Sequence, residues 1–266
     1  SSPAEYQVIA EERIDLIANS TPNHNDDGSM NMTPQRQITG LLATGTQAHP
    51  VLYVTSSDWR IAVGKDTGLD TNSGVISRLT WDGQAWEKVD LVRGFPRSEE
   101  NHSVNGMDLD EARQTLYVMV GGATNKGAPS NNFAGITEYY LSGALITVDL
   151  AQLDNMPVWT DPRGGISYVY DLPTLNDPER PNIDNSHPDF PYPPGHPMYQ
   201  HTIDPGDPFG GNDGLNQAII EPGGPVQIYS PGYRNAYDIV LTQSGALYTS
   251  DNGPNGGWGG QPKVYD

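Results

Sequence analysis

The chain has 266 residues, with 14 Lys and Arg against 33 Asp and Glu, a formal net charge of -19 and no cysteine. This negative charge repels phosphate backbones and anionic lipid headgroups, and no stretch reaches the roughly 18 apolar residues of a membrane span, so nucleic acid and membrane are excluded as expected partners. The lack of cysteine excludes disulfides, thiolate zinc sites and a cysteine nucleophile.

In chain order, residues 4–17 are the one segment whose apolar spacing fits a helix, although the alternation of Ile14 and Leu16 fits a strand nearly as well. The remaining elements read as strands, because short runs of β-branched and aromatic residues are separated by Gly, Asn, Asp and Pro. These runs are residues 51–55, 75–81, 116–120, 144–150, 168–172, 226–230 and 247–250. Many short strands with such turns predict an all-β sandwich, barrel or propeller.

An internal repeat favours the propeller. Each copy has a polar residue, a Gly or Asp four positions later, an apolar strand, a turn, and then Leu-Tyr followed by Val or Thr. The copies begin at Arg36, His102 and Arg234, and their tyrosines lie 64 and then 131 positions apart, as if one degenerate copy stood between the last two. Since propeller blades usually have about 40–45 residues, we expect insertions at 58–74, at 121–143 and after 173.

Residues 173–216 combine Pro-rich sequence with Asn, Asp and Gly and show no sustained periodicity. Within a single domain covering 1–266, we interpret them as a long inter-blade loop over the top face of the propeller. A mobile surface loop without a role is the alternative interpretation.

Two blocks carry a family resemblance. Residues 97–109 read RSEENHSVNGMDL and continue to LYVMVGGATNKG at 116–127, while YSPGYRNAYDI at 229–239 is followed by LYTSDNGPNGG at 247–257. In this order the blocks resemble the soluble quinoprotein glucose and sorbosone dehydrogenases, which have a His before one inner strand, a Gly-rich loop with an Asn after the next, and Gly-x-Arg-Asn and Gly-Pro blocks. The match covers about a third of the chain.

The resemblance implies a six-bladed β-propeller that binds pyrroloquinoline quinone and calcium on its axis and oxidises an aldose or related sugar. His102 would then be the general base for the sugar hydroxyl, a role that suits an imidazole near neutral pH, while the cofactor accepts the hydride. Asn125 matches a quinone-contacting position, and Lys126 could pair with a quinone carboxylate. A purely structural His102 is the alternative.

Arg36, His102 and Arg234 share one position in the repeat, so equivalent blades would direct all three toward a common axis. Two arginines and a histidine in one funnel would suit a cofactor with three carboxylates, because guanidinium groups pair well with carboxylates. Alternatively, each arginine neutralises an acidic neighbour or bonds a loop carbonyl.

The acidic composition, rich in Asn, Asp, Gly and Pro, favours calcium-binding loops and an extracellular or periplasmic location. Oxygen ligands in Gly-containing loops suit calcium, although neither candidate segment has EF-hand spacing and each is also compatible with an Asx turn. The candidate calcium ligands are Asp66, Asp70, Asn72, Asn212, Asp213 and Asn216.

The sequence departs from the family after the Gly-Pro block. Family members carry further cationic cofactor ligands there, whereas this sequence has 12 residues after Pro254, and Trp258 follows the paired glycines where acidic residues are common. We therefore expect an incomplete propeller that closes with the remainder from the same or another chain.

The alternative to a sugar dehydrogenase is a non-catalytic, calcium-stabilised module of a large secreted or surface protein that binds glycan or protein or has a structural role. A propeller lactonase fits the fold without a matching motif.

Overall fold

The computed structural model describes residues 11–21, 23–24, 30–31, 33–61, 71–127, 133, 138–161, 165–173 and 217–255. This part of the chain is mostly β, and none of its sheets closes on itself. Two short helices accompany the strands, α1 (Leu16–Ser20) and α2 (Leu150–Asp154). No helix among the described residues is long and apolar enough to cross a membrane.

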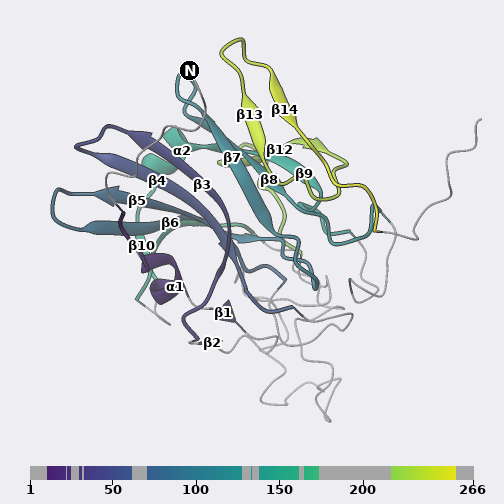
Figure 1. The fold of residues 1–266 in the computed structure, drawn as a ribbon, viewed down its shortest axis with the longest axis horizontal. Coiled ribbons are helices and arrows are strands. Elements are labelled where there is room, and N and C mark those ends of the chain that lie inside the picture. The colour runs from purple at the N-terminus through teal and green to yellow at the C-terminus, as the bar shows by residue number, and fades with distance from the viewer. Residues whose placement is uncertain are drawn as a thin grey trace, which may run out of the picture.

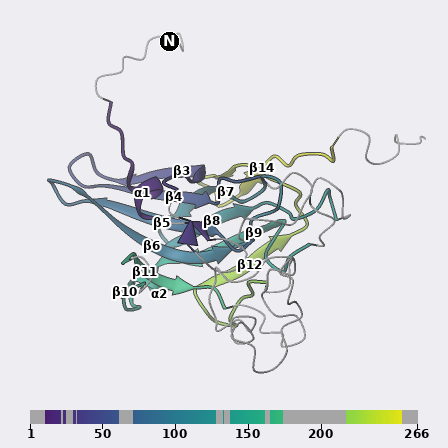
Figure 2. The ribbon, with the colours of Figure 1, turned by 90° about the horizontal axis from the view of Figure 1, so that it is seen from below.

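Three sheets follow one another (Figures 1 and 2), and a separate short pair joins β1 (Asn23–His24) to β2 (Met30–Asn31). The first sheet is an antiparallel meander extended by β11, which pairs in parallel with β6, and by β10. Its strands are β3 (Gln37–Gly45), β4 (Pro50–Ser57), β5 (Gly74–Trp81), β6 (Trp86–Phe95), β10 (Trp159–Thr160) and β11 (Ser167–Asp171).

The second and third sheets are wholly antiparallel. The second contains β7 (Val104–Asp110), β8 (Thr115–Val120), β9 (Ala144–Asp149) and β12 (Val226–Pro231). The third is the hairpin of β13 (Ile239–Leu241) and β14 (Leu247–Thr249). Its place at one end of the molecule is clear in Figure 1, where it is the yellow hairpin.

The period of two in the strands gives each sheet two apolar faces. In β8, Leu116 and Val118 belong to the largest apolar cluster, with residues of the first sheet, whereas Tyr117 and Met119 belong to a second cluster with Ile239 of the third sheet. Side chains that alternate along one strand therefore pack against two different neighbouring sheets. A third cluster, which includes Ile17 and Val54, joins α1 to the far face of the first sheet.

The first strands of successive sheets approach one another closely at the repeat glycines. A Cβ at Gly40 would lie 2.6 Å from the Asn105 carbonyl oxygen of β7, and a Cβ at Gly106 would lie 2.4 Å from Asp238 Oδ1 beside β13. The Gly106 N–H donates to the Tyr237 carbonyl at 3.0 Å. Glycine is therefore required at these two positions because any side chain would separate the sheets.

The sequence predictions of the strands are confirmed, since all seven predicted runs overlap strands of the structure. The helix prediction falls partly outside the described residues, and in the described part a helix begins only at Leu16. The spacing of the repeats suggested one degenerate copy between the last two. This prediction is wrong, because the third sheet packs directly against the second, with β13 next to β7. Part of the extra length instead forms β10 and β11, which return to β6 of the first sheet.

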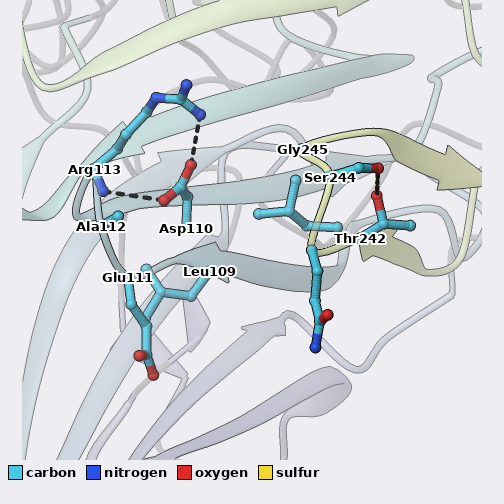
Figure 3. A pocket seen from close by; sticks show the side chains of 10 residues that line it. Leu109, Asp110, Glu111, Ala112, Arg113, Thr242, Ser244 and Gly245 are labelled. Carbon is cyan, nitrogen blue, oxygen red and sulfur yellow. Dashed lines mark hydrogen bonds and ion pairs between the residues drawn. The ribbon is translucent and has the colours of Figure 1, made fainter.

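Two ends of the sheets differ in character. Arg36 and His102 immediately precede β3 and β7, so they lie at the same end of their sheets. At the opposite end, the β7–β8 and β13–β14 turns line a hollow of about 670 Å³ (Figure 3). Its rim includes Asp110, whose carboxylate is paired with Arg113 at 2.7 Å. This ion pair holds the β7–β8 turn. The candidate functional residues lie at the opposite end of the sheets, with His102.

Candidate functional site

His102 is buried, with 3% of its surface exposed, and its ring is held in one orientation. Its Nδ1 lies 2.9 Å from the Gly122 carbonyl oxygen, and its ring packs against Phe133 at a centroid distance of 4.9 Å. A carbonyl can only accept, so Nδ1 carries the hydrogen in the neutral ring and Nε2 keeps its lone pair. Nε2 lies 3.9 Å from a carboxylate oxygen of Glu100, whose side chain is 28% exposed.

Electrostatics keep this imidazole uncharged. Burial lowers the pKa of His102 from 6.5 to about 4; the Gly122 carbonyl opposes this effect, and the positive charges of Arg234 and Arg97 add to it. An imidazole with such a pKa is neutral at pH 7 and offers Nε2 as a proton acceptor.

Asn125 and Arg234 form a second buried pair beside His102. Asn125 Oδ1 accepts from Arg234 Nε at 3.2 Å and from the Asn255 N–H at 3.0 Å. Asn125 is 2% exposed, and its Nδ2 is buried without a hydrogen-bond partner among the described residues. A buried amide donor with no acceptor costs free energy, so an acceptor supplied by a ligand would be favourable at this point.

Backbone contacts bring these groups together. The Gly122 N–H donates to the Arg234 carbonyl at 2.6 Å, while a Cβ at Gly121 would lie 2.8 Å from the Cβ of His102. Asp251 accepts from the backbone N–H groups of Arg234 and Asn235, each at 2.8 Å. The paired glycines therefore let three segments converge with little room between their backbones.

Arg36 lies in a different environment. Its guanidinium donates to Asn23 Oδ1 at 2.9 Å and to the Ser73 carbonyl at 2.7 Å, with longer contacts to Ser56 Oγ. All of these partners surround the first sheet. The structure thus brings His102, Asn125 and Arg234 together, while the guanidinium of Arg36 is engaged by Asn23, Ser56 and Ser73.

Arg97 is a buried residue that the sequence reasoning missed. Its guanidinium donates to the carbonyls of Asp58, Arg60 and Ser98. Burial lowers its pKa to about 10, against the opposing effect of nearby carboxylates, so the group remains charged at pH 7. Ser98 in turn donates its N–H to the His102 carbonyl at 2.8 Å and accepts the His102 N–H at 2.9 Å. Its place as the first residue of the matched block at 97–109 was the one signal in the sequence, and it did not indicate this role.

Two of the other predicted site residues, Lys126 and Asn72, belong to the described part of the chain. Lys126 is exposed next to Asn125, with a left-handed backbone at φ 62°, and Asn72 is buried in the turn before β5. Asp66, Asp70, Asn212, Asp213, Asn216 and nearly all of the 173–216 loop lie outside the described residues. Within the described ranges, no three His, Asp or Glu side chains form a group that could hold a metal ion.

Comparison with known protein families, with curated proteins and with solved structures found no match to this chain.

Proposed function

We propose that this protein oxidises an aldose or related sugar with pyrroloquinoline quinone and calcium, with His102 as the base. The observation that carries the proposal is the His102 ring, fixed as a neutral imidazole with its Nδ1–H on the Gly122 carbonyl. Nε2 is then the atom that takes the proton from a sugar hydroxyl. The side chain facing Nε2, that of Glu100, is partly exposed and marks the direction of access.

The residues around His102 fit the proposed cofactor. The buried Nδ2 of Asn125 lacks an acceptor in the described structure, and Arg234 brings a guanidinium to the same place. Together with exposed Lys126, they would hold a carboxylate-bearing quinone. The bound quinone would supply the two-electron acceptor for the hydride of the sugar.

The charges around His102 control the pKa of the proposed base. The neighbouring guanidinium of Arg234 helps to lower the pKa of His102. An anionic ligand paired with Arg234 would offset this effect and raise the pKa toward neutrality, where an imidazole is the most effective base. Calcium belongs to the proposal through the acidic loops of the sequence, and chelation by EDTA should abolish quinone binding if the ion is required.

The arrangement of the sheets supports the propeller as part of the same proposal. Three sheets stack in chain order, each led by one copy of the repeat, and the contacts at Gly40 and Gly106 are equivalent. We propose that these sheets are consecutive blades, and that further blades from the same or another chain cover the outer faces. Val240 and Tyr248, which pair across the third sheet, are 56% and 65% exposed and would contact the next blade.

Titration of the full-length protein with the quinone and calcium tests the proposal. Saturable change in the absorbance of the quinone, followed by bleaching on addition of an aldose, is the expected result. His102→Asn should retain binding, because an amide can still donate to Gly122, and lose the bleaching; His49→Asn, at an exposed turn histidine, is the matched control. Bleaching that survives in His102→Asn would remove His102 from the mechanism.

The second candidate is a non-catalytic, calcium-stabilised module, exported like the enzyme, that binds glycan or protein. Arg36 favours it, since the repeat predicted a cofactor contact for its guanidinium, which is instead held by Asn23 and Ser73. Absence of quinone binding by the full-length protein would leave this candidate in place.

A further inference from the structure

A second hollow adjoins the loop that carries Asn125. It has a volume of about 400 Å³ and lies where the loop after β8 meets the start of β9 and the end of β12. Lys126, Glu138, Tyr139, Tyr140 and Tyr233 contribute to its wall. Volumes of roughly 300 to 1,000 Å³ with aromatic walls and a few polar groups are usual for small-molecule sites.

The wall of this hollow is fixed by Glu138. Its carboxylate accepts from the Ala123 N–H and from the hydroxyls of Thr124 and Ser142. Thr124 Oγ1 also accepts from the Gly127 N–H at 2.7 Å. The Glu138 carboxylate therefore joins the loop after β8 to the segment before β9, and its oxygens already accept hydrogen bonds from both.

Lys126 has an unusual backbone for its position. With φ 62°, it is one of two described non-glycine residues in the left-handed region. This conformation is unfavourable for a lysine, and it persists because Glu138 and Thr124 hold the flanking residues. The lysine side chain is exposed and makes no hydrogen bond or ion pair within the described part of the chain. Lys126 therefore brings to the hollow an ammonium group that has no partner among the described residues.

The tyrosines provide the complementary apolar surface. Tyr140 is 50% exposed, and its backbone N–H is held by Gln217 Oε1 at 2.8 Å. Tyr233 also lines the hollow, and its backbone N–H donates to the Gly143 carbonyl at 2.9 Å. Aromatic rings with hydroxyls offer an apolar face and a polar tip, which matches a sugar ring with its C–H face and peripheral hydroxyls.

We propose that this hollow is a carbohydrate subsite that binds a neutral pyranose ring. The C–H face of the sugar packs on a tyrosine ring, with Tyr140 the accessible one, and Lys126 donates hydrogen bonds to hydroxyl oxygens. His102 does not line this hollow, although Gly122, whose carbonyl bonds His102 Nδ1, lies against Glu138 of its wall. Lys126 is shared with the proposed quinone site, but sugar binding here needs neither the quinone nor hydride transfer, so a test without cofactor distinguishes the two proposals.

The test measures sugar binding in the absence of quinone and calcium. Saturation-transfer NMR of the full-length protein with methyl glucosides, galactosides and mannosides should show transfer to the ring protons. Tyr140→Ala should weaken binding by about three- to tenfold, the value of one aromatic contact. Trp159→Ala, at a 54% exposed aromatic residue on the edge strand β10, is the matched control and should leave binding unchanged.

Lys126→Gly separates a binding role from a structural one. Glycine adopts positive φ without strain, so the variant should melt at the same or a higher temperature while binding the sugar more weakly. A lower melting temperature with unchanged affinity would overturn the assignment of Lys126. Lack of transfer to any pyranoside, binding of inorganic phosphate or citrate alone, or equal affinity in Tyr140→Ala would overturn the subsite.

Discussion

The buried histidine predicts a specific dependence of stability on pH. In the unfolded chain, His102 takes up a proton below its ordinary pKa of 6.5, whereas in the folded protein it does so only near pH 4. Between these values the unfolded state binds more protons, so the free energy of unfolding falls as the pH is lowered from 6.5 to 4. Above that window the two states bind the same number of protons at this site, and the contribution is constant.

The magnitude follows from the gap between the two pKa values. At 1.36 kcal/mol per pH unit, the shift from 6.5 to about 4 corresponds to a loss on the order of 3 kcal/mol across the window. His102 is 3% exposed, so solvent screening reduces this value little. A loss of this size is a substantial part of the stability of an ordinary domain.

Urea unfolding at intervals between pH 4 and 7.5 measures the effect in the wild type and in His102→Asn. Asparagine retains a donor for the Gly122 carbonyl and does not titrate, so the variant should lose the part of the slope that belongs to His102. Carboxylates with a lowered pKa, such as those of Asp82 and Asp110, contribute equally to both proteins and cancel in the difference. Parallel curves for the two proteins, or an NMR titration of the His102 ring with a midpoint near 6.5, would refute the reasoning.

Two further predictions concern packing. Gly106→Ala should lower the free energy of unfolding, measured in urea, by about 1–3 kcal/mol, because the new Cβ would lie 2.4 Å from Asp238 Oδ1. Gly253→Ala is the control and should have little effect, since a Cβ there would have nothing within 4 Å. Equal stabilities of the two variants would contradict the close approach of the sheets. Arg93→Met should cost about 3–5 kcal/mol, because two carboxylates at 2.6 and 2.8 Å lose their buried partner. Arg113→Met removes an arginine whose side chain is 70% exposed and should change stability by less than about 1 kcal/mol. A similar loss in both variants would argue against a buried network around Arg93.

Local sequence was sufficient for the strands. Runs of β-branched and aromatic residues between turn residues predicted the strands, and the Leu-Tyr pairs at positions 52, 116 and 247 each marked the second strand of a hairpin. The residues of the matched blocks also pointed to His102, Asn125 and Arg234, which the structure places together. These features depend on neighbours in the chain, which a single sequence displays.

Only the tertiary structure decided which sheets meet and which polar groups they share. Spacing along the chain suggested an extra repeat before Arg234, yet β13 packs on β7, and part of the intervening chain pairs with the first sheet as β10 and β11. Arg36 and Arg234 occupy the same position in the repeat but have different hydrogen-bond partners in the structure. The guanidinium of Arg97 donates to carbonyls of residues 37 and 39 positions away in the chain. Burial, lost hydration and long-range hydrogen bonds arise when distant segments pack, so no local pattern specifies them.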